Sequence, residues 1–250
     1  MDIEVKVKSL KKALDILDCF TLEKPELGIT ELSTLLSLNK SNVHNSVSTF
    51  EACGYLEQNP ASEKYRLSLK ILHLAHIASR NMSFQSIVHK AVNELSEAFD
   101  EIVYFGIPDG ENVMYMDGGF PEKIYNVRWV QGMTAPLVCT SIGKAILAYM
   151  PEEFICKVLE KPLEKFTDFT ITNPKQIHAQ LRHIKECGYS EDRMEHEYGI
   201  KCVGVPVFNN YEKLIGALST TGPSLRFTDD KMAEYVAALK KKATEIRNVI

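Results

Sequence analysis

Residues 28–67 constrain the fold more than any other part of this 250-residue chain. Their apolar side chains recur at three- and four-residue steps, as the buried faces of two short consecutive helices require. These positions are Ile29, Leu32, Leu35, Leu36, Val43, Val47 and Phe50. We expect Thr30 to cap the first helix and Ser41 to cap the second, with Gly54 in the left-handed conformation that ends a helix.

The residues around this helical pair complete a recognisable small domain. Residues 55–57 and 65–67 read as two strands, and residues 59–62 between them form a turn-rich tip. An earlier helix over residues 10–20 supplies a third apolar face, made of Leu10, Leu14, Leu17 and Phe20. Three helices followed by a hairpin predict a winged helix-turn-helix, which places its second turn-linked helix in the major groove of DNA.

The outward face of that second helix carries short side chains that form hydrogen bonds. Such groups reach phosphates and base edges without filling the groove, and basic residues on the wing would add contacts to the DNA backbone. The candidate DNA-binding residues are Asn39, Lys40, Ser41, Asn42, His44, Asn45, Ser48, Lys64 and Arg66. The alternative is a solvated polar face on a helical hairpin.

The charge of the N-terminal region is unusual for a domain that binds double-stranded DNA. Residues 1–66 hold 8 basic and 10 acidic side chains, a net charge of −2, whereas many DNA-binding domains are basic. Counterion release scales with the number of phosphates contacted, so we expect modest affinity per unit. We therefore expect a homodimer or a dimer of dimers.

The composition is that of an ordinary soluble globular protein, with 45% hydrophobic and 25% charged residues and a net charge of −4. The six cysteines show no CxxC spacing, and the first residues lack the apolar segment of a secretory signal. No apolar run approaches the roughly 20 residues of a membrane span. We expect a cytoplasmic protein with free thiols and no membrane partner.

The remainder of the chain predicts a linker and a second domain, with boundaries at 1–67, 68–81 and 82–250. The linker helix should turn its apolar side chains inward, namely Ile71, Leu72, Ala75 and Ile77 or Ala78. Beyond it we expect helices over residues 140–149, 151–159 and 174–187, a last helix, strands over 102–107, 113–116, 124–130, 201–208 and 214–221, and turns at 108–110 and 118–119. Asn173 and Pro174 form a helix start and Gly188 a helix end. Helices that flank an antiparallel sheet indicate a mixed α+β fold.

Four segments together resemble the IclR family of bacterial transcriptional regulators. They are the run CGYLEQ at the end of the winged helix, SIGKAILAYM, CGYSEDRMEHEYGIKCVGVPVFN and ALSTTGP, in this order and spacing. The resemblance extends over essentially the whole chain. It implies an N-terminal winged helix-turn-helix, a linker helix and a GAF-like C-terminal domain that binds a small effector. It also implies a ligand-responsive regulator of a catabolic operon, with no enzymatic activity and no cofactor.

The same resemblance implies an effector site between the sheet and the segments above it. The matching positions are Ser141, Ile142, Asp192, Cys202, Ser219 and Thr221. Hydroxyl groups and the backbone amides at a helix start can hold a carboxylate, so we expect a small organic acid or sugar acid. The alternatives are that Asp192 caps a turn, that Cys202 is a small core residue, and that Ser219 and Thr221 only pair across strands.

Three other functions remain open from the residues. Cys139 and Cys202 are candidates for a thiol redox enzyme, although acidic neighbours would raise a thiol pKa. For a metal sensor, His178 and His183 lie five residues apart and so do not share the usual four-residue helical face, whereas a cluster of Cys187 with Glu195 and His196 stays open; we expect no metal. In the third alternative, the winged helix is a surface for dimerisation.

Overall fold

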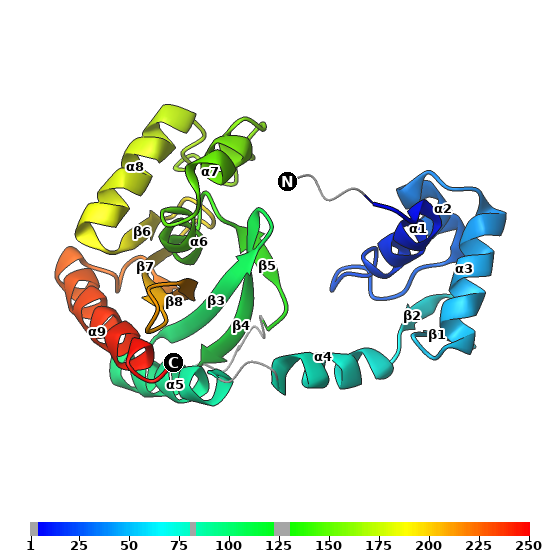
Figure 1. The fold of residues 1–250 in the computed structure, drawn as a ribbon, viewed down its shortest axis with the longest axis horizontal. Coiled ribbons are helices and arrows are strands. Elements are labelled where there is room, and N and C mark those ends of the chain that lie inside the picture. The colour runs from blue at the N-terminus through cyan, green and yellow to red at the C-terminus, as the bar shows by residue number, and fades with distance from the viewer. Residues whose placement is uncertain (1–4, 81–83, 123–130) are drawn as a thin grey trace. The chain divides into compact units, whose positions relative to one another are not determined.

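The computed structural model describes residues 5–80, 84–122 and 131–250. The contacts between Cα atoms divide the chain into two compact units, Met1–Met82 and Ser83–Ile250 (Figure 1). Each unit has its own apolar core, so each is described separately. Within the described residues no helix is both long and apolar enough to cross a membrane.

The first unit is a winged helix-turn-helix, as predicted. It consists of α1 (Lys8–Leu17), α2 (Ile29–Leu36), α3 (Lys40–Ala52), β1 (Leu56–Gln58), β2 (Tyr65–Leu67) and α4 (Lys70–Arg80). Its buried core is made of Ile16, Leu27, Leu32, Val43, Val47, Leu56 and Tyr65. The two strands pair antiparallel, and Gly54 follows α3 with φ +77°, the left-handed conformation that was expected.

Both predicted caps in this unit are wrong. Helix α2 begins one residue before Thr30, with Gly28 as its N-cap, because the Glu31 carboxylate reaches back to accept the Gly28 amide at 2.7 Å. Helix α3 begins at Lys40 with Asn39 as its N-cap, so Ser41 lies inside the first turn.

Two predicted apolar faces differ from the structure. Helix α1 ends at Leu17, and of its predicted face Leu17 and Phe20 pack against the core whereas Leu10 and Leu14 are exposed, because only the last turn of α1 meets the core. Helix α4 begins at Lys70, and none of residues 70–78 is buried. Leu72 is 65% exposed, and among the described residues the core of the first unit includes no side chain of α4.

The second unit is a six-stranded antiparallel sheet with helices on both faces, which confirms the α+β class. Its elements are α5 (Gln85–Phe99), β3 (Ile102–Asp109), β4 (Asn112–Gly119), β5 (Thr134–Pro136), α6 (Ser141–Leu147), α7 (Glu152–Leu159), α8 (Pro174–Cys187), β6 (Ser190–Arg193), β7 (Ile200–Phe208), β8 (Leu214–Pro223) and α9 (Asp229–Arg247). The strand order is β5-β4-β3-β8-β7-β6. Helices α5 and α9 cover one face, and α6, α7 and α8 lie on the other (Figure 1).

Several local predictions for this unit are confirmed. Asn173 caps α8 by accepting two backbone amides, and Gly188 ends that helix in the left-handed conformation. The last helix buries the apolar side that was predicted for it.

Others differ from the prediction. Residues 118–119 continue β4 and do not form a turn, because they pair with Tyr104 and Val103 of β3. Gly119 is a glycine for a packing reason, since a Cβ there would lie 2.2 Å from the Val92 carbonyl oxygen of α5. Strands β5 and β6 were missed, and the strand expected over residues 124–130 lies outside the described residues.

Candidate functional site

A row of polar side chains crosses three neighbouring strands of the sheet. Asp192 of β6 pairs with Cys202 of β7, and Cys202 pairs with Thr221 of β8. Residues two apart on a strand share a face, so Ser219 lies in the next row on the same side. The register therefore brings together four of the six predicted effector residues.

Helix α6 lies directly over these rows. Thr140 caps it by accepting the Gly143 amide, and the Ser141 carbonyl accepts a hydrogen bond of 2.6 Å from the Ser190 hydroxyl of β6. Gly204 permits this approach, because a Cβ there would lie 2.8 Å from the Ser141 carbonyl oxygen. The Ile142 side chain packs instead on Gly106 of β3, because a Cβ added to Gly106 would lie 2.9 Å from Cδ1 of Ile142.

Each polar group of the first row already has a hydrogen-bond partner within the second unit. The Cys202 thiol donates to the Thr221 hydroxyl at 3.0 Å, and Asp192 accepts the Glu195 amide at 2.7 Å. Asp192 thus caps a turn, as the alternative interpretation proposed, while its side chain is 3% exposed. Burial raises the pKa of Asp192 to about 7, although the positive charge of Lys144 opposes the shift.

A buried ion pair lies beside this row and was missed from the sequence. Lys144 of α6 is fully buried and donates to Glu195, which is 5% exposed. The second carboxylate oxygen of Glu195 is buried without a hydrogen-bond partner in the described part of the chain. The sequence did contain a signal for this ion pair, namely a single lysine in the otherwise apolar run SIGKAILAY. A charge on a helix that is buried all round must be paired.

The segment between α7 and α8 covers this ion pair. Thr167 donates to the Met194 carbonyl and Thr170 donates to the Glu195 carbonyl, each at 2.6 Å. The rings of Tyr104 and Tyr115 lie 5.2 Å apart on the same side of the sheet. The cluster of Ser141, Lys144, Asp192, Glu195, Cys202 and Thr221, here called the polar cluster, is thus enclosed from several directions.

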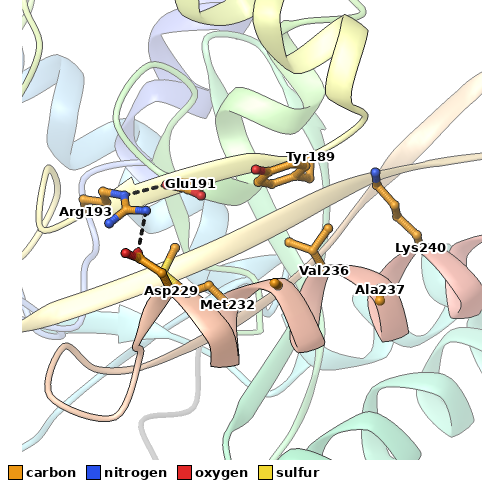
Figure 2. A pocket seen from close by; sticks show the side chains of 9 residues that line it. Tyr189, Glu191, Arg193, Asp229, Met232, Val236, Ala237 and Lys240 are labelled. Carbon is orange, nitrogen blue, oxygen red and sulfur yellow. Dashed lines mark hydrogen bonds and ion pairs between the residues drawn. The ribbon is translucent and has the colours of Figure 1, made fainter.

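A separate groove lies on the opposite side of β6. Its volume is about 460 Å³, and Glu191 and Arg193, which alternate with Asp192 along the strand, line it together with α9. Figure 2 shows Met232 and Val236 along its apolar floor and Arg193 bonded to Glu191 and Asp229. The side chains of this groove point away from the polar cluster.

The two thiols considered for redox chemistry, Cys139 and Cys202, lack the features of reactive cysteines. Burial raises the pKa of Cys139 to about 12, and burial together with the Asp192 charge raises the pKa of Cys202 even further. A protonated buried thiol is a poor nucleophile. The geometry therefore does not favour the thiol redox alternative.

Most of the predicted DNA-binding residues of α3 are exposed. All of those from Asn39 to Asn45 are exposed, while Ser48 is half-buried and Val43 and Val47 point into the core. Lys40 begins α3 and has no ion-pair partner among the described residues. The start of α3 is therefore free to contact a phosphate and the base edges beside it.

The wing differs from the expectation because its basic side chains are already paired. Lys64 bonds to Glu31 at 3.0 Å, and Arg66 bonds to Glu57 at 2.6 Å with Glu26 at 3.8 Å. These groups are partly exposed, so the ion pairs are weak. Phosphate contacts from the wing would have to displace them.

Comparison with known proteins places both units in one group. The profile described as "IclR helix-turn-helix domain" matches residues 9–60, and the profile described as "Bacterial transcriptional regulator IclR C-terminal" matches residues 76–248. The HTH-type transcriptional regulator KdgR of Escherichia coli is 34% identical over 96% of this chain and 91% of its own length.

Solved structures share the fold. The transcriptional regulator of Alicyclobacillus acidocaldarius has a TM-score of 0.87 at 22% identity, covering 98% of this chain and 99% of that one. A homologue from Microbacterium hydrocarbonoxydans, complexed with 4-hydroxybenzoate, has a TM-score of 0.82 at 19% identity, covering 96% and 98%.

Proposed function

Because this chain belongs to the IclR family of bacterial transcriptional regulators, we propose that it controls a catabolic operon in response to a small organic acid or sugar acid. The chain is a DNA-binding regulator and not an enzyme. The effector binds at the polar cluster, and its binding changes the affinity of the winged helix for an operator.

The observation that carries this proposal is the row of Asp192, Cys202 and Thr221 beneath the start of α6. Its one hydroxyl group, that of Thr221, accepts from the Cys202 thiol and can still donate to a carboxylate. Asp192, whose pKa is about 7, is partly protonated near neutral pH and can then donate a hydrogen bond to an anionic ligand. The 4-hydroxybenzoate of the Microbacterium homologue likewise combines a carboxylate with a hydroxyl group.

The effector assignment is tested by thermal shift against a panel of aliphatic acids, aromatic acids and sugar acids. A ligand that binds only the folded state raises the melting temperature by mass action. We expect a hit that is lost in Asp192→Ala and in Thr221→Val. The matched control is Thr220→Val, since Thr220 alternates to the other face and donates to the Ile102 carbonyl. A shift that survives both cluster variants would place the effector elsewhere.

On the DNA side, α3 reads base edges and Lys40 contacts a phosphate. Asn42→Ala and His44→Ala should relax sequence preference, whereas Lys40→Ala should weaken binding to all sequences alike. Fluorescence anisotropy with an operator and a scrambled duplex measures both. Equal losses on the two duplexes for all three variants would contradict this assignment.

A homodimer or a dimer of dimers supplies the second recognition helix. One unit offers few free cations, and two half-sites lie roughly 34–36 Å apart or multiples of this on one face of DNA. The expected coupling between effector and DNA is about 1–3 kcal/mol, a 5- to 150-fold change in affinity. Light scattering with and without the duplex gives the stoichiometry, and a single chain per operator would contradict this arrangement.

A further inference from the structure

Three side chains of different chemistry converge on the surface where α7 meets α8. Glu152 and Cys156 are four residues apart and therefore lie on one face of α7. His178 projects from the beginning of α8. One ligand atom from each of the three lies within 4.8 Å of the other two, and His178 Nδ1 is 3.6 Å from Glu152 Oε1.

We propose that Glu152, Cys156 and His178 form a Zn²⁺ site that joins α7 to α8. Bonds of about 2.0–2.3 Å in a tetrahedral site put neighbouring ligand atoms roughly 3.3–3.7 Å apart. The His178–Glu152 distance already falls in that interval. Small side-chain rotations bring in the third ligand, and such rotations are free because Glu152 and Cys156 are exposed.

The chemistry of the set selects the metal. A thiolate with an imidazole suits Zn²⁺, whereas Mg²⁺ and Ca²⁺ take oxygen ligands. Binding releases the thiol proton of Cys156 to solvent, and the resulting thiolate and the carboxylate balance the charge of the ion. Three protein ligands leave the fourth tetrahedral position for a water molecule.

The backbone holds the three ligand positions in place without the ion. Ile155, beside Cys156, and Ile177, beside His178, are both buried in the same apolar core. The two helices also bracket the segment whose Thr167 and Thr170 cover the polar cluster. A bound ion would therefore join the two ends of that segment.

The site is tested on the full chain, reduced and stripped with chelator, by titration with Co²⁺ alone. We expect one equivalent to bind with a thiolate-to-cobalt charge-transfer band that Zn²⁺ abolishes by competition. The band should vanish in Cys156→Ser and persist in Cys53→Ser, the matched variant of another exposed cysteine.

The same cobalt titration tests whether His178 of α8 is a metal ligand. Loss of groups that only support a metal ligand costs about 10- to 100-fold in affinity, so His178→Ala should weaken binding by about tenfold or more. His183→Ala, an exposed histidine on the same helix, should leave affinity unchanged. Absence of a saturable band, its persistence in Cys156→Ser, or equal losses in the two histidine variants would overturn the proposal.

Discussion

The clearest quantitative consequence of the structure concerns the pH dependence of stability through Asp192. Its carboxyl group is buried beneath α6, and burial raises its pKa from 3.8 to about 7. The folded chain therefore holds this proton over a pH range in which the unfolded chain has already lost it. Because the folded state binds more protons, its stability must fall as the pH rises through that range.

The magnitude follows from the pKa shift. About three pKa units at about 1.4 kcal/mol each give a loss of about 4 kcal/mol between pH 3.8 and pH 7, with no further change above it. Asp192→Asn has no proton to lose and keeps an oxygen that accepts the Glu195 amide. We expect the variant to gain about 3 kcal/mol relative to the wild type between pH 5 and pH 8.

The assay is urea unfolding of both proteins, followed by circular dichroism at several pH values. The difference between the two curves isolates Asp192 from other titrating groups. Asp168→Asn is the control of opposite sign, because hydrogen bonds from Tyr198 and Lys165 lower the pKa of that exposed carboxyl. Parallel curves for the wild type and Asp192→Asn would refute the argument, and an advantage that shrinks with pH would show that the Lys144 charge outweighs burial.

Three further perturbations test other parts of the structure. Lys144→Met should lower the unfolding free energy by about 3–5 kcal/mol, because it leaves the Glu195 charge buried alone. In urea unfolding, the double variant Lys144→Met with Glu195→Gln should lose less than Lys144→Met by itself. Losses that simply add in the double variant would contradict the pairing. In a plot of the logarithm of operator affinity against the logarithm of salt concentration, Lys40→Ala should reduce the slope by about one unit. Arg66→Ala should reduce it less, because Arg66 is already paired with Glu57. Equal slopes for the two variants would refute this difference. Gly119→Ala should destabilise by roughly 1–3 kcal/mol, since the new methyl group meets the backbone of α5; an unchanged melting temperature would show that helix and strand can separate.

The sequence predicted those elements whose signal is local. The apolar period of α9 and the Asn173–Pro174 start of α8 each depend on residues within one helix, and both are confirmed. Strand β6 was missed because its residues, Ser190–Arg193, are all polar. It is a strand because β7 pairs with it and because α6 buries Ser190, and neither partner is visible in a local pattern.

The residues of the candidate site could likewise be predicted singly from the sequence, but not their arrangement. A resemblance named Asp192, Cys202 and Thr221 separately, and the strand register places them in one row. The partnership of Lys144 with Glu195 spans 51 residues, so spacing could not reveal it. Similarly, Leu10 and Leu14 satisfied the helical period of α1 and are nevertheless exposed, because periodicity identifies an apolar face but not what covers it.

The electrostatic state of the polar cluster explains how a small ligand could have a large effect. Asp192 is buried with a raised pKa, and one oxygen of Glu195 has no partner within the described residues. A ligand could remove both unfavourable features, by donating to the Glu195 oxygen and by accepting from protonated Asp192, because an unsatisfied buried polar atom costs about 1–3 kcal/mol. A hydroxy acid that donates to Glu195 and accepts from protonated Asp192 would gain this energy only in the arrangement where α6 and the Thr167 segment enclose it. A ligand shifts an equilibrium by its differential affinity for two states, so the enclosure of these groups is what would make effector binding favour one arrangement of the chain over another.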